Sequence, residues 1–142
     1  MSRFRKLSQT VWHCQYHIVW CPKYRFRVLE GSIKKEVEDC IKTFTSVQEC
    51  ELIELNVQVD HVHLLVMIPP KISVSSYMGT VKGRTAIRVL NKFRKLKQKP
   101  FWGNHLWARG YCVDTVGIDI EMIRKYIKYQ EEKERDSEKT IH

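Results

Sequence analysis

Two histidines, His61 and His63, stand two residues apart in a segment whose other members are apolar. Residues i and i+2 of a β-strand point to the same face, so both imidazoles would project from one side of a sheet. Two neutral imidazoles side by side form a pair of metal ligands. Histidine pairs on strands also arise by chance, so this spacing alone leaves both interpretations open.

Tyr126 and Gln130 form a second chemical pair, four residues apart near the C-terminus. Residues at this spacing share one face of a helix. A glutamine oxygen is a hard ligand that could complete a site begun by two histidines, and a tyrosine hydroxyl is a possible nucleophile. The alternative is that Tyr126 is a boundary aromatic whose hydroxyl faces water. Tyr129, which directly precedes Gln130, is a rival for the nucleophile.

Positive charge is concentrated in one part of the chain. The sequence contains 25 Lys and Arg against 16 Asp and Glu, a net charge of +9 at pH 7. Residues 82–99 contain basic residues and no acid. A helix face exposed to solvent would explain the lysines, but it would not explain the complete absence of acidic residues. Because neutralised phosphates release counterions, such a block suits a nucleic acid. We therefore expect backbone contacts from four residues in its helical part: Lys82, Arg84, Arg88 and Lys92.

Length and composition limit which classes of protein this chain can belong to. At 142 residues, 43% of them hydrophobic, the chain is expected to form a single domain over residues 1–142, with residues 131–142 as a frayed charged tail. Its longest apolar run is too short to cross a membrane, and no signal-peptide segment opens it, so we expect a cytoplasmic protein without a membrane partner. The five cysteines are scattered and contain no Cys-x-x-Cys pair, which argues against a disulfide framework or a cysteine zinc site.

Hydrophobic periodicity and turn residues predict the elements that must position these side chains. Strands are expected at Thr10–Trp20, Glu51–Val59, His61–Ile68 and within Phe101–Val116. Helices are expected at Ser32–Val47, after a Ser73 cap, and after an Asp119 cap, the last with a buried stripe of Ile120, Ile123 and Ile127. The order β-α-β-β-α-β-α predicts a ferredoxin-like or RNA-recognition-like α+β fold, an antiparallel sheet backed by helices with an additional C-terminal helix that carries the tyrosine.

Several motifs occur together in a specific order. His61-Val62-His63 follows Asp60, Tyr126-Ile127-x-x-Gln130 comes much later, and characteristic stretches occupy residues 16–25, 73–83 and 109–117. The sequence thereby resembles the single-tyrosine HUH transposases, the small TnpA-type enzymes of bacterial insertion sequences and their REP-associated relatives. The resemblance runs from about Thr10 to Gln130. His-x-His alone would be a weak signal, whereas five ordered blocks are specific.

The resemblance implies a reaction that these residue types can support. Tyr126 would attack a phosphate of single-stranded DNA, leaving a 5′-phosphotyrosine and a free 3′-hydroxyl, and it is preferred to Tyr129 because the family places the nucleophile four residues before the glutamine. His61, His63 and Gln130 would hold Mg²⁺ or Mn²⁺, which assists the transesterification. The covalent link would conserve the phosphodiester energy, so rejoining would need no ATP.

The resemblance also implies partners. The substrate would be single-stranded DNA with a hairpin near each element end, and the protein would be a homodimer in which the tyrosine helix of one subunit serves the histidines of the other. Three alternatives stay open from the residues themselves. They are a domesticated relative that processes repeated palindromes, a non-enzymatic RNA- or DNA-binding module that stacks bases on Trp12 or Tyr16, and a metal nuclease that uses water.

Overall fold

A computed structural model describes residues 5–7, 10–12, 14–97 and 105–117, together with the single positions 124, 127, 128, 132 and 135. The chain divides into two compact units. One comprises Met1–His13 and Gly117–His142, and the other comprises Cys14–Val116. The expected single domain stays a prediction. No helix among the described residues is long and apolar enough to span a lipid bilayer.

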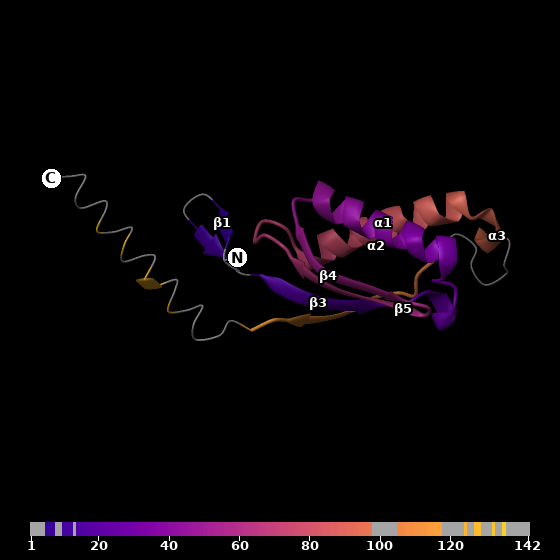
Figure 1. Ribbon diagram of the computed structural model, residues 1–142, viewed down its shortest axis with the longest axis horizontal. Coiled ribbons are helices and arrows are strands. Elements are labelled where there is room, and N and C mark those ends of the chain that lie inside the picture. The colour runs from indigo at the N-terminus through magenta and orange to yellow at the C-terminus, as the bar shows by residue number, and fades with distance from the viewer. Residues whose placement is uncertain are drawn as a thin grey trace. The chain divides into compact units, whose positions relative to one another are not determined.

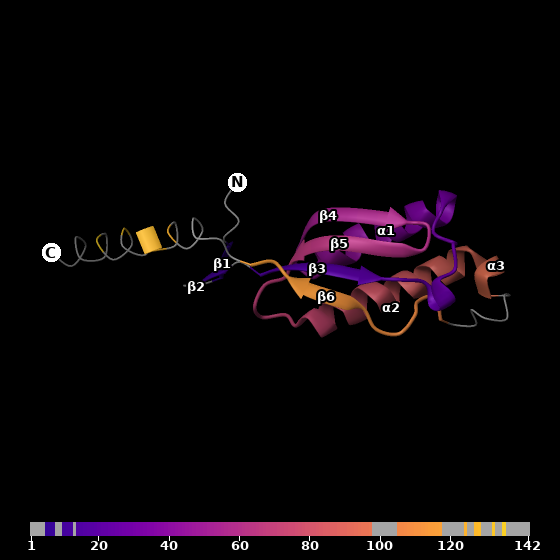
Figure 2. The same ribbon diagram turned by 90° about the horizontal axis from the view of Figure 1, so that it is seen from below.

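The larger unit contains a four-stranded antiparallel sheet in the order β4-β5-β3-β6 (Figure 2). Its strands are β3 (Gln15–Trp20), β4 (Glu51–Gln58), β5 (His61–Met67) and β6 (Cys112–Thr115). Two helices, α1 (Gly31–Val47) and α2 (Val74–Lys92), lie side by side over one face of this sheet (Figure 1). The short helices η1 (Lys23–Arg25) and α3 (Arg94–Lys97) complete the unit. The predicted ferredoxin-like α+β fold is therefore confirmed.

Alternating burial from His61 to Val66 in β5 separates the two faces of the sheet. Val62, Leu64 and Val66 are at most 1% exposed, and they pack in the core beneath the helices. Since neighbouring residues point to opposite faces, His61 and His63 belong to the face that α1 and α2 leave uncovered. We call this the open face of the sheet.

The hairpin of β4 and β5 has the turn that the sequence predicted. Gln58 pairs with His61 and Asn56 pairs with His63, so Asp60 lies in the connection between the strands. A register shift between Leu52 and Glu54 marks a β-bulge farther along β4. The bulge lies at the end of the strand away from the histidines, and their pairing is regular.

The two long helices begin in different ways. Ser73 caps α2 as predicted, because its Oγ accepts a hydrogen bond from the Ser76 backbone N–H at 3.0 Å. The predicted Ser32 cap of α1 is wrong. That helix begins at Gly31, whose φ of +56° suits glycine, and the residue before it makes no side-chain capping bond.

The N-terminal strand prediction also needs correction. Residues 10–20 form two strands, because β2 (Thr10–Trp12) pairs with β1 (Arg5–Leu7), whereas β3 begins only at Gln15 and pairs with β5 and β6. The alternation of apolar residues continues through both strands, so the sequence pattern does not show that β2 and β3 pair with different strands. In the C-terminal segment, Ile127 is 50% exposed rather than buried as expected. Asp119, Ile120 and Ile123 lie outside the described residues.

Candidate functional site

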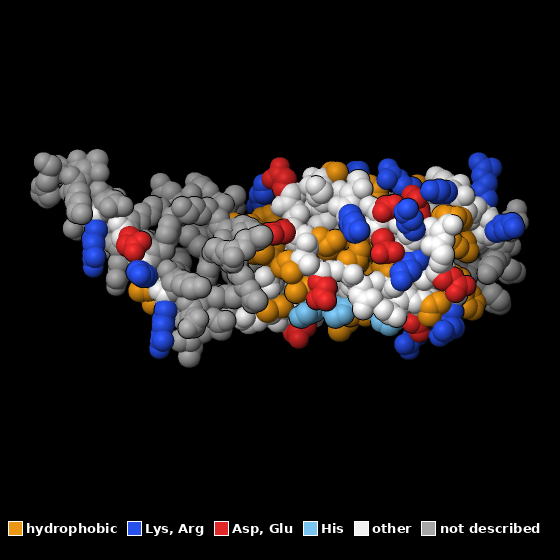
Figure 3. Space-filling model, viewed as in Figure 1, with side chains coloured by type: hydrophobic (Ala, Val, Ile, Leu, Met, Phe, Trp, Pro, Cys, Tyr) orange, Lys and Arg blue, Asp and Glu red, His pale blue; other side chains and the backbone are white. Residues whose placement is uncertain are grey.

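Three histidines from two adjacent strands share the open face. The pairing of β3 with β5 sets Val19 opposite His63 and His17 opposite Leu65, so His17 projects to the same side as His61 and His63. All three imidazoles are partly exposed. Figure 3 shows histidine side chains gathered on the sheet side of this unit, while many Lys and Arg side chains lie over the helices.

His63 and His17 are in direct contact. The Nε2 atom of His63 lies 3.3 Å from the Nδ1 atom of His17, and the ring centroids are 5.4 Å apart. One of these two nitrogens must carry the proton of the hydrogen bond. His17 was not among the candidate ligands predicted from the sequence. The sequence did indicate that His17 points to the face opposite Ile18 and Trp20, because it alternates with them along the strand. Only the register of β3 against β5 shows that it lies next to His63.

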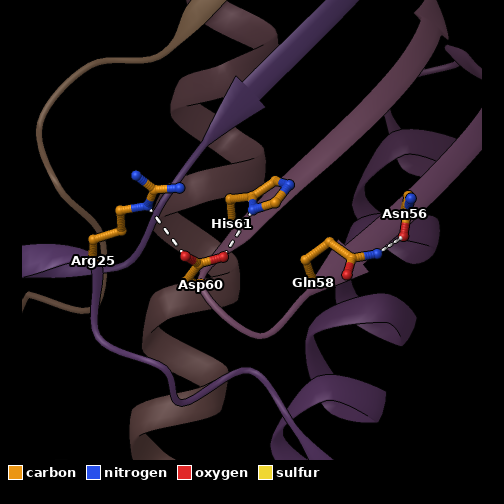
Figure 4. Close-up of polar contacts among 5 residues, drawn as sticks. All are labelled: Arg25, Asn56, Gln58, Asp60 and His61. Carbon is orange, nitrogen blue, oxygen red and sulfur yellow. Dashed lines mark hydrogen bonds and ion pairs between the residues drawn. The ribbon is translucent and has the colours of Figure 1, made fainter.

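His61 is held by a chain of polar contacts that starts in the β4–β5 turn (Figure 4). Its Nδ1 lies 2.9 Å from Oδ1 of Asp60, and the Nε of Arg25 lies 3.2 Å from Oδ2 of the same carboxylate. The hydrogen bond with His61, supported by the Arg25 charge, lowers the pKa of Asp60 below its usual value. A carboxylate on one imidazole nitrogen fixes the ring and its tautomer, and the Nε2 atom of His61 is the ring nitrogen that this contact does not use.

The expected metal site is only partly within the described residues. His61 and His63 present two imidazole groups on one face, which a divalent transition-metal ion can accept as two of several ligands. No cluster of three or more His, Cys, Asp or Glu that could hold an ion occurs in the described part of the chain. Gln130, the predicted third ligand, lies outside the described residues, as do Tyr126 and Tyr129.

Lys82 is used inside the fold. Its ammonium donates to the backbone carbonyls of Ala108 and Gly110, both at 2.9 Å, and its own carbonyl accepts from Nε1 of Trp107 at 3.1 Å. Burial lowers the pKa of this ammonium below the ordinary value for lysine. A lysine has three N–H donors, so DNA contact by Lys82 stays a prediction that involves at most the remaining one.

We expect Lys82→Ala to destabilise the protein by about 1–3 kcal/mol, because it deletes two charge-assisted hydrogen bonds, one of them to the half-buried Ala108 carbonyl. Lys42 is exposed on α1, so Lys42→Ala should change stability by no more than about 0.5 kcal/mol. Urea denaturation of both variants measures the difference. Equal stability of the two variants would show that Lys82 does not brace the 108–110 loop.

The remaining candidate DNA-binding residues lie on the helix side of the sheet. The guanidinium carbons of Arg84 and Arg88 lie 5.9 and 5.1 Å from the ring centroid of Phe44, and both side chains are exposed. Lys92 forms an ion pair with Glu36 at 2.8 Å, so part of its charge is already compensated. These residues line a shallow groove of about 500 Å³. The structure thus separates the predicted basic surface from the histidines, which occupy the opposite face.

Comparison with known proteins identifies relatives over nearly the whole chain. The family model described as "Transposase IS200 like" matches residues 10–130. The transposase of insertion sequence element IS200 from Salmonella typhimurium is 38% identical over 138 residues, which is 97% of this chain and 90% of that protein. The ISDra2 transposase TnpA of Deinococcus radiodurans is 35% identical over 125 residues, covering 87% of this chain and 89% of the relative.

Solved structures give the same result at the level of the fold. A crystal structure of a protein assigned as a transposase in Deinococcus radiodurans R1 superposes with a TM-score of 0.74 and 33% identity, covering 89% of this chain and 97% of that one. A REP-associated tyrosine transposase bound to a REP hairpin superposes with a TM-score of 0.54, over 91% of this chain and 70% of the other. At 14% identity, the second likeness concerns the fold alone.

Proposed function

The chain belongs to the IS200-like transposase family, and from this membership we propose that it cleaves and rejoins single-stranded DNA through a 5′-phosphotyrosine on Tyr126. One observation carries the proposal. The family match over residues 10–130 spans both the histidine pair and the Tyr126/Gln130 pair, and the fold sets His61 and His63 on one open face of the sheet. Each of the four residues is of the type that this chemistry requires.

Cleavage and rejoining are the same exchange run in two directions. The Tyr126 oxygen attacks the scissile phosphorus, a new phosphorus–oxygen bond forms, and the bond to the 3′-oxygen breaks. The departing 3′-oxygen takes up a proton, and the tyrosine proton passes to a base, because an unperturbed tyrosine pKa is about 10. A 3′-hydroxyl of another strand then attacks the phosphotyrosine and releases Tyr126. One phosphodiester is made for each one broken, so no nucleotide triphosphate is consumed.

In this proposal His61, His63 and Gln130 hold the divalent cation. Mg²⁺ or Mn²⁺ bound there would supply Lewis-acid polarisation of the scissile phosphate. The described residues already orient the His61 ring before any ion binds. Asp60 accepts from its imidazole, and Arg25 in turn restrains the Asp60 carboxylate. Such outer contacts keep a ligand nitrogen aimed before any ion binds.

We further propose single-stranded DNA with hairpin ends as the substrate and a homodimer with shared active sites as the working form. The REP-associated tyrosine transposase, which has the same fold, was solved with a REP hairpin bound. The exposed arginines of α2 offer a surface of matching charge. A domesticated role in processing repeated palindromes uses the same chemistry. The DNA on either side of the gene distinguishes the two roles, because a transposase gene is flanked by the ends of its element.

A covalent adduct tests the proposed reaction. Purified protein would be incubated with single-stranded DNA from the flanks of its own gene, labelled on either side of the cleavage point. We expect label from the 3′ part, which carries the 5′ phosphate, to remain with the protein in denaturing gels. Cleavage without any adduct would support a nuclease that uses water, and binding without cleavage would support a non-enzymatic module.

The basic surface on α2 predicts a measurable salt dependence. If Arg84 and Arg88 each contact a phosphate, the double variant Arg84→Ala/Arg88→Ala should flatten the log–log dependence of affinity on salt by about 1.4 to 1.8 units. Titration of labelled hairpin DNA at several salt concentrations gives this slope. Because backbone contacts carry no sequence information, the loss should be similar for unrelated hairpins.

A matched control removes equal charge from the neighbouring helix. Lys35 and Lys42 are exposed on α1, so Lys35→Ala/Lys42→Ala changes the net charge by the same amount without altering the α2 surface. We expect its slope to equal that of the wild type. Equal flattening in both variants would show that overall charge, rather than these two arginines, sets the salt dependence.

A further inference from the structure

A cavity opens beside His61, next to the end of β3 and the start of β6. Its volume is about 710 Å³, within the range of roughly 300 to 1,000 Å³ that is typical of small-molecule sites. Its lining comes from three parts of the larger unit: the end of β3 with the η1 turn, His61 of β5, and the 108–112 segment. The cavity therefore borders one of the predicted metal ligands, and most of its other lining residues fall within the characteristic stretches at residues 16–25 and 109–117.

The first wall of the cavity is a constrained turn. Tyr24 and Arg25 have φ values of +56° and +54°, a region that non-glycine residues rarely occupy. The turn is held by the Lys23 backbone N–H, which donates to the Leu106 carbonyl at 2.9 Å. This conformation brings the Arg25 side chain to Asp60 (Figure 4). Strained backbone that the surrounding contacts hold in place is characteristic of binding and catalytic sites.

The second wall is the 108–110 loop that Lys82 braces. Besides the two hydrogen bonds from Lys82, the Ala108 backbone N–H donates to the Cys21 carbonyl at 3.0 Å. Gly110 has a φ of +79°, which favours glycine at this turn. Both walls are thus fixed to each other and to α2. A cavity with fixed walls loses little conformational entropy when a ligand binds.

The chemistry of the lining is that of an anion site next to an aromatic ring. Arg25 uses its Nε for Asp60 and has further N–H donors on the same guanidinium. Arg109 is exposed and has no acidic partner among the described residues, and none of the described lining residues is an acid. Tyr111 contributes a half-buried aromatic ring to the same lining. Guanidinium groups recognise phosphate, and aromatic rings stack on bases.

We propose that this cavity binds one nucleotide of single-stranded DNA, adjacent to the phosphate that the histidines address. Arg109 and the free edge of Arg25 contact its phosphate, and Tyr111 stacks on its base. Lys82 is a positioning residue, because it holds the loop that carries Arg109. The inference rests on the proposed function for the identity of the DNA strand, and it adds a nucleotide subsite on the sheet side, separate from the basic surface of α2.

Photochemical cross-linking tests the subsite directly. The full chain with Tyr126→Phe, which should bind DNA without cutting it, is irradiated with an oligothymidylate that contains one 5-iododeoxyuridine. Mass spectrometry then locates the cross-linked peptide. We expect Tyr111 to carry the cross-link, because iodouracil couples to an aromatic ring stacked on it. Cross-links confined to α1 and α2 would overturn the proposal.

Affinity measurements with the same oligothymidylate provide a second readout. Arg109→Ala and Tyr111→Leu should each weaken binding by roughly tenfold, through loss of a charge-assisted contact and a stacking contact respectively. Tyr111→Phe keeps the ring and should lose less affinity than Tyr111→Leu, and urea denaturation of each variant checks for a folding defect. Lys42→Ala, the control on α1, should also be unchanged. Unaltered affinity of both Arg109→Ala and Tyr111→Leu would refute the subsite.

The two proposals fail in different ways. Covalent adduct formation by the wild-type protein reports on Tyr126 and does not depend on where an oligothymidylate cross-links. An adduct together with cross-links outside the cavity would overturn the subsite and leave the reaction intact. Cross-links at Tyr111 without an adduct would support the subsite and reject the phosphotyrosine reaction.

Discussion

Tyr126→Phe is expected to eliminate cleavage and the covalent adduct while folding and DNA binding persist. The substitution removes one hydroxyl, and no other group on the ring can attack phosphorus. Loss of a covalent nucleophile lowers turnover by roughly 10⁴-fold or more, which places the variant below detection in a gel assay. Hairpin affinity measured on the same preparation should match the wild type, since the hydroxyl is needed for chemistry rather than for docking.

Tyr129→Phe is the matched control for this experiment. It removes the same hydroxyl from the neighbouring candidate, three residues farther along the chain. We expect this variant to cleave DNA and to form the adduct. If Tyr126→Phe still forms the adduct while Tyr129→Phe does not, the nucleophile is Tyr129 and the spacing argument is wrong.

His61→Ala and His63→Ala are expected to have the second largest effect. Each removes one imidazole from the open face, and a missing metal ligand should reduce cleavage by roughly 10³-fold or more. Hairpin binding should stay within a few-fold, because the basic surface lies on the other side of the sheet. Cleavage assays with added Mn²⁺ or Mg²⁺, and with excess chelator, measure the dependence.

His17 offers a comparison within the same cluster. It contacts His63 at 3.3 Å but is not one of the predicted ligands, so His17→Gln should retain more activity than His63→Ala. Undiminished cleavage in excess chelator would reject the metal altogether. Equal loss in the His17 and His63 variants would instead make His17 a full member of the site.

The sequence was most informative where a single strand or helix decides the outcome. The alternation of β5 predicted that His61 and His63 would share a face, and the structure shows it through the burial of Val62 and Leu64 between and beyond them. Ser73 was identified as a cap from local chemistry alone. The order of elements predicted the ferredoxin-like sheet, because few topologies connect such an order with short loops.

Features that depend on long-range pairing could not be predicted from one sequence. His17 joins the site only through the register of β3 against β5, and the division of residues 10–20 into β2 and β3 reflects a change of partner. Lys82 looked like part of a nucleic-acid surface, because charge patterning cannot reveal that the ammonium reaches the 108–110 loop. The same holds for Arg25, whose contact with Asp60 depends on a constrained turn.

In the proposed reaction Tyr126 becomes covalently linked to DNA. The most direct measurement is to digest the purified adduct with protease and nuclease and to identify, by mass spectrometry, the residue that carries the remaining nucleotide. We expect a phosphodiester link between the Tyr126 oxygen and the 5′ phosphate of the nucleotide that follows the cleavage point. A nucleotide on any other residue, or cleaved DNA with a free 5′ phosphate and no modified peptide, would contradict it.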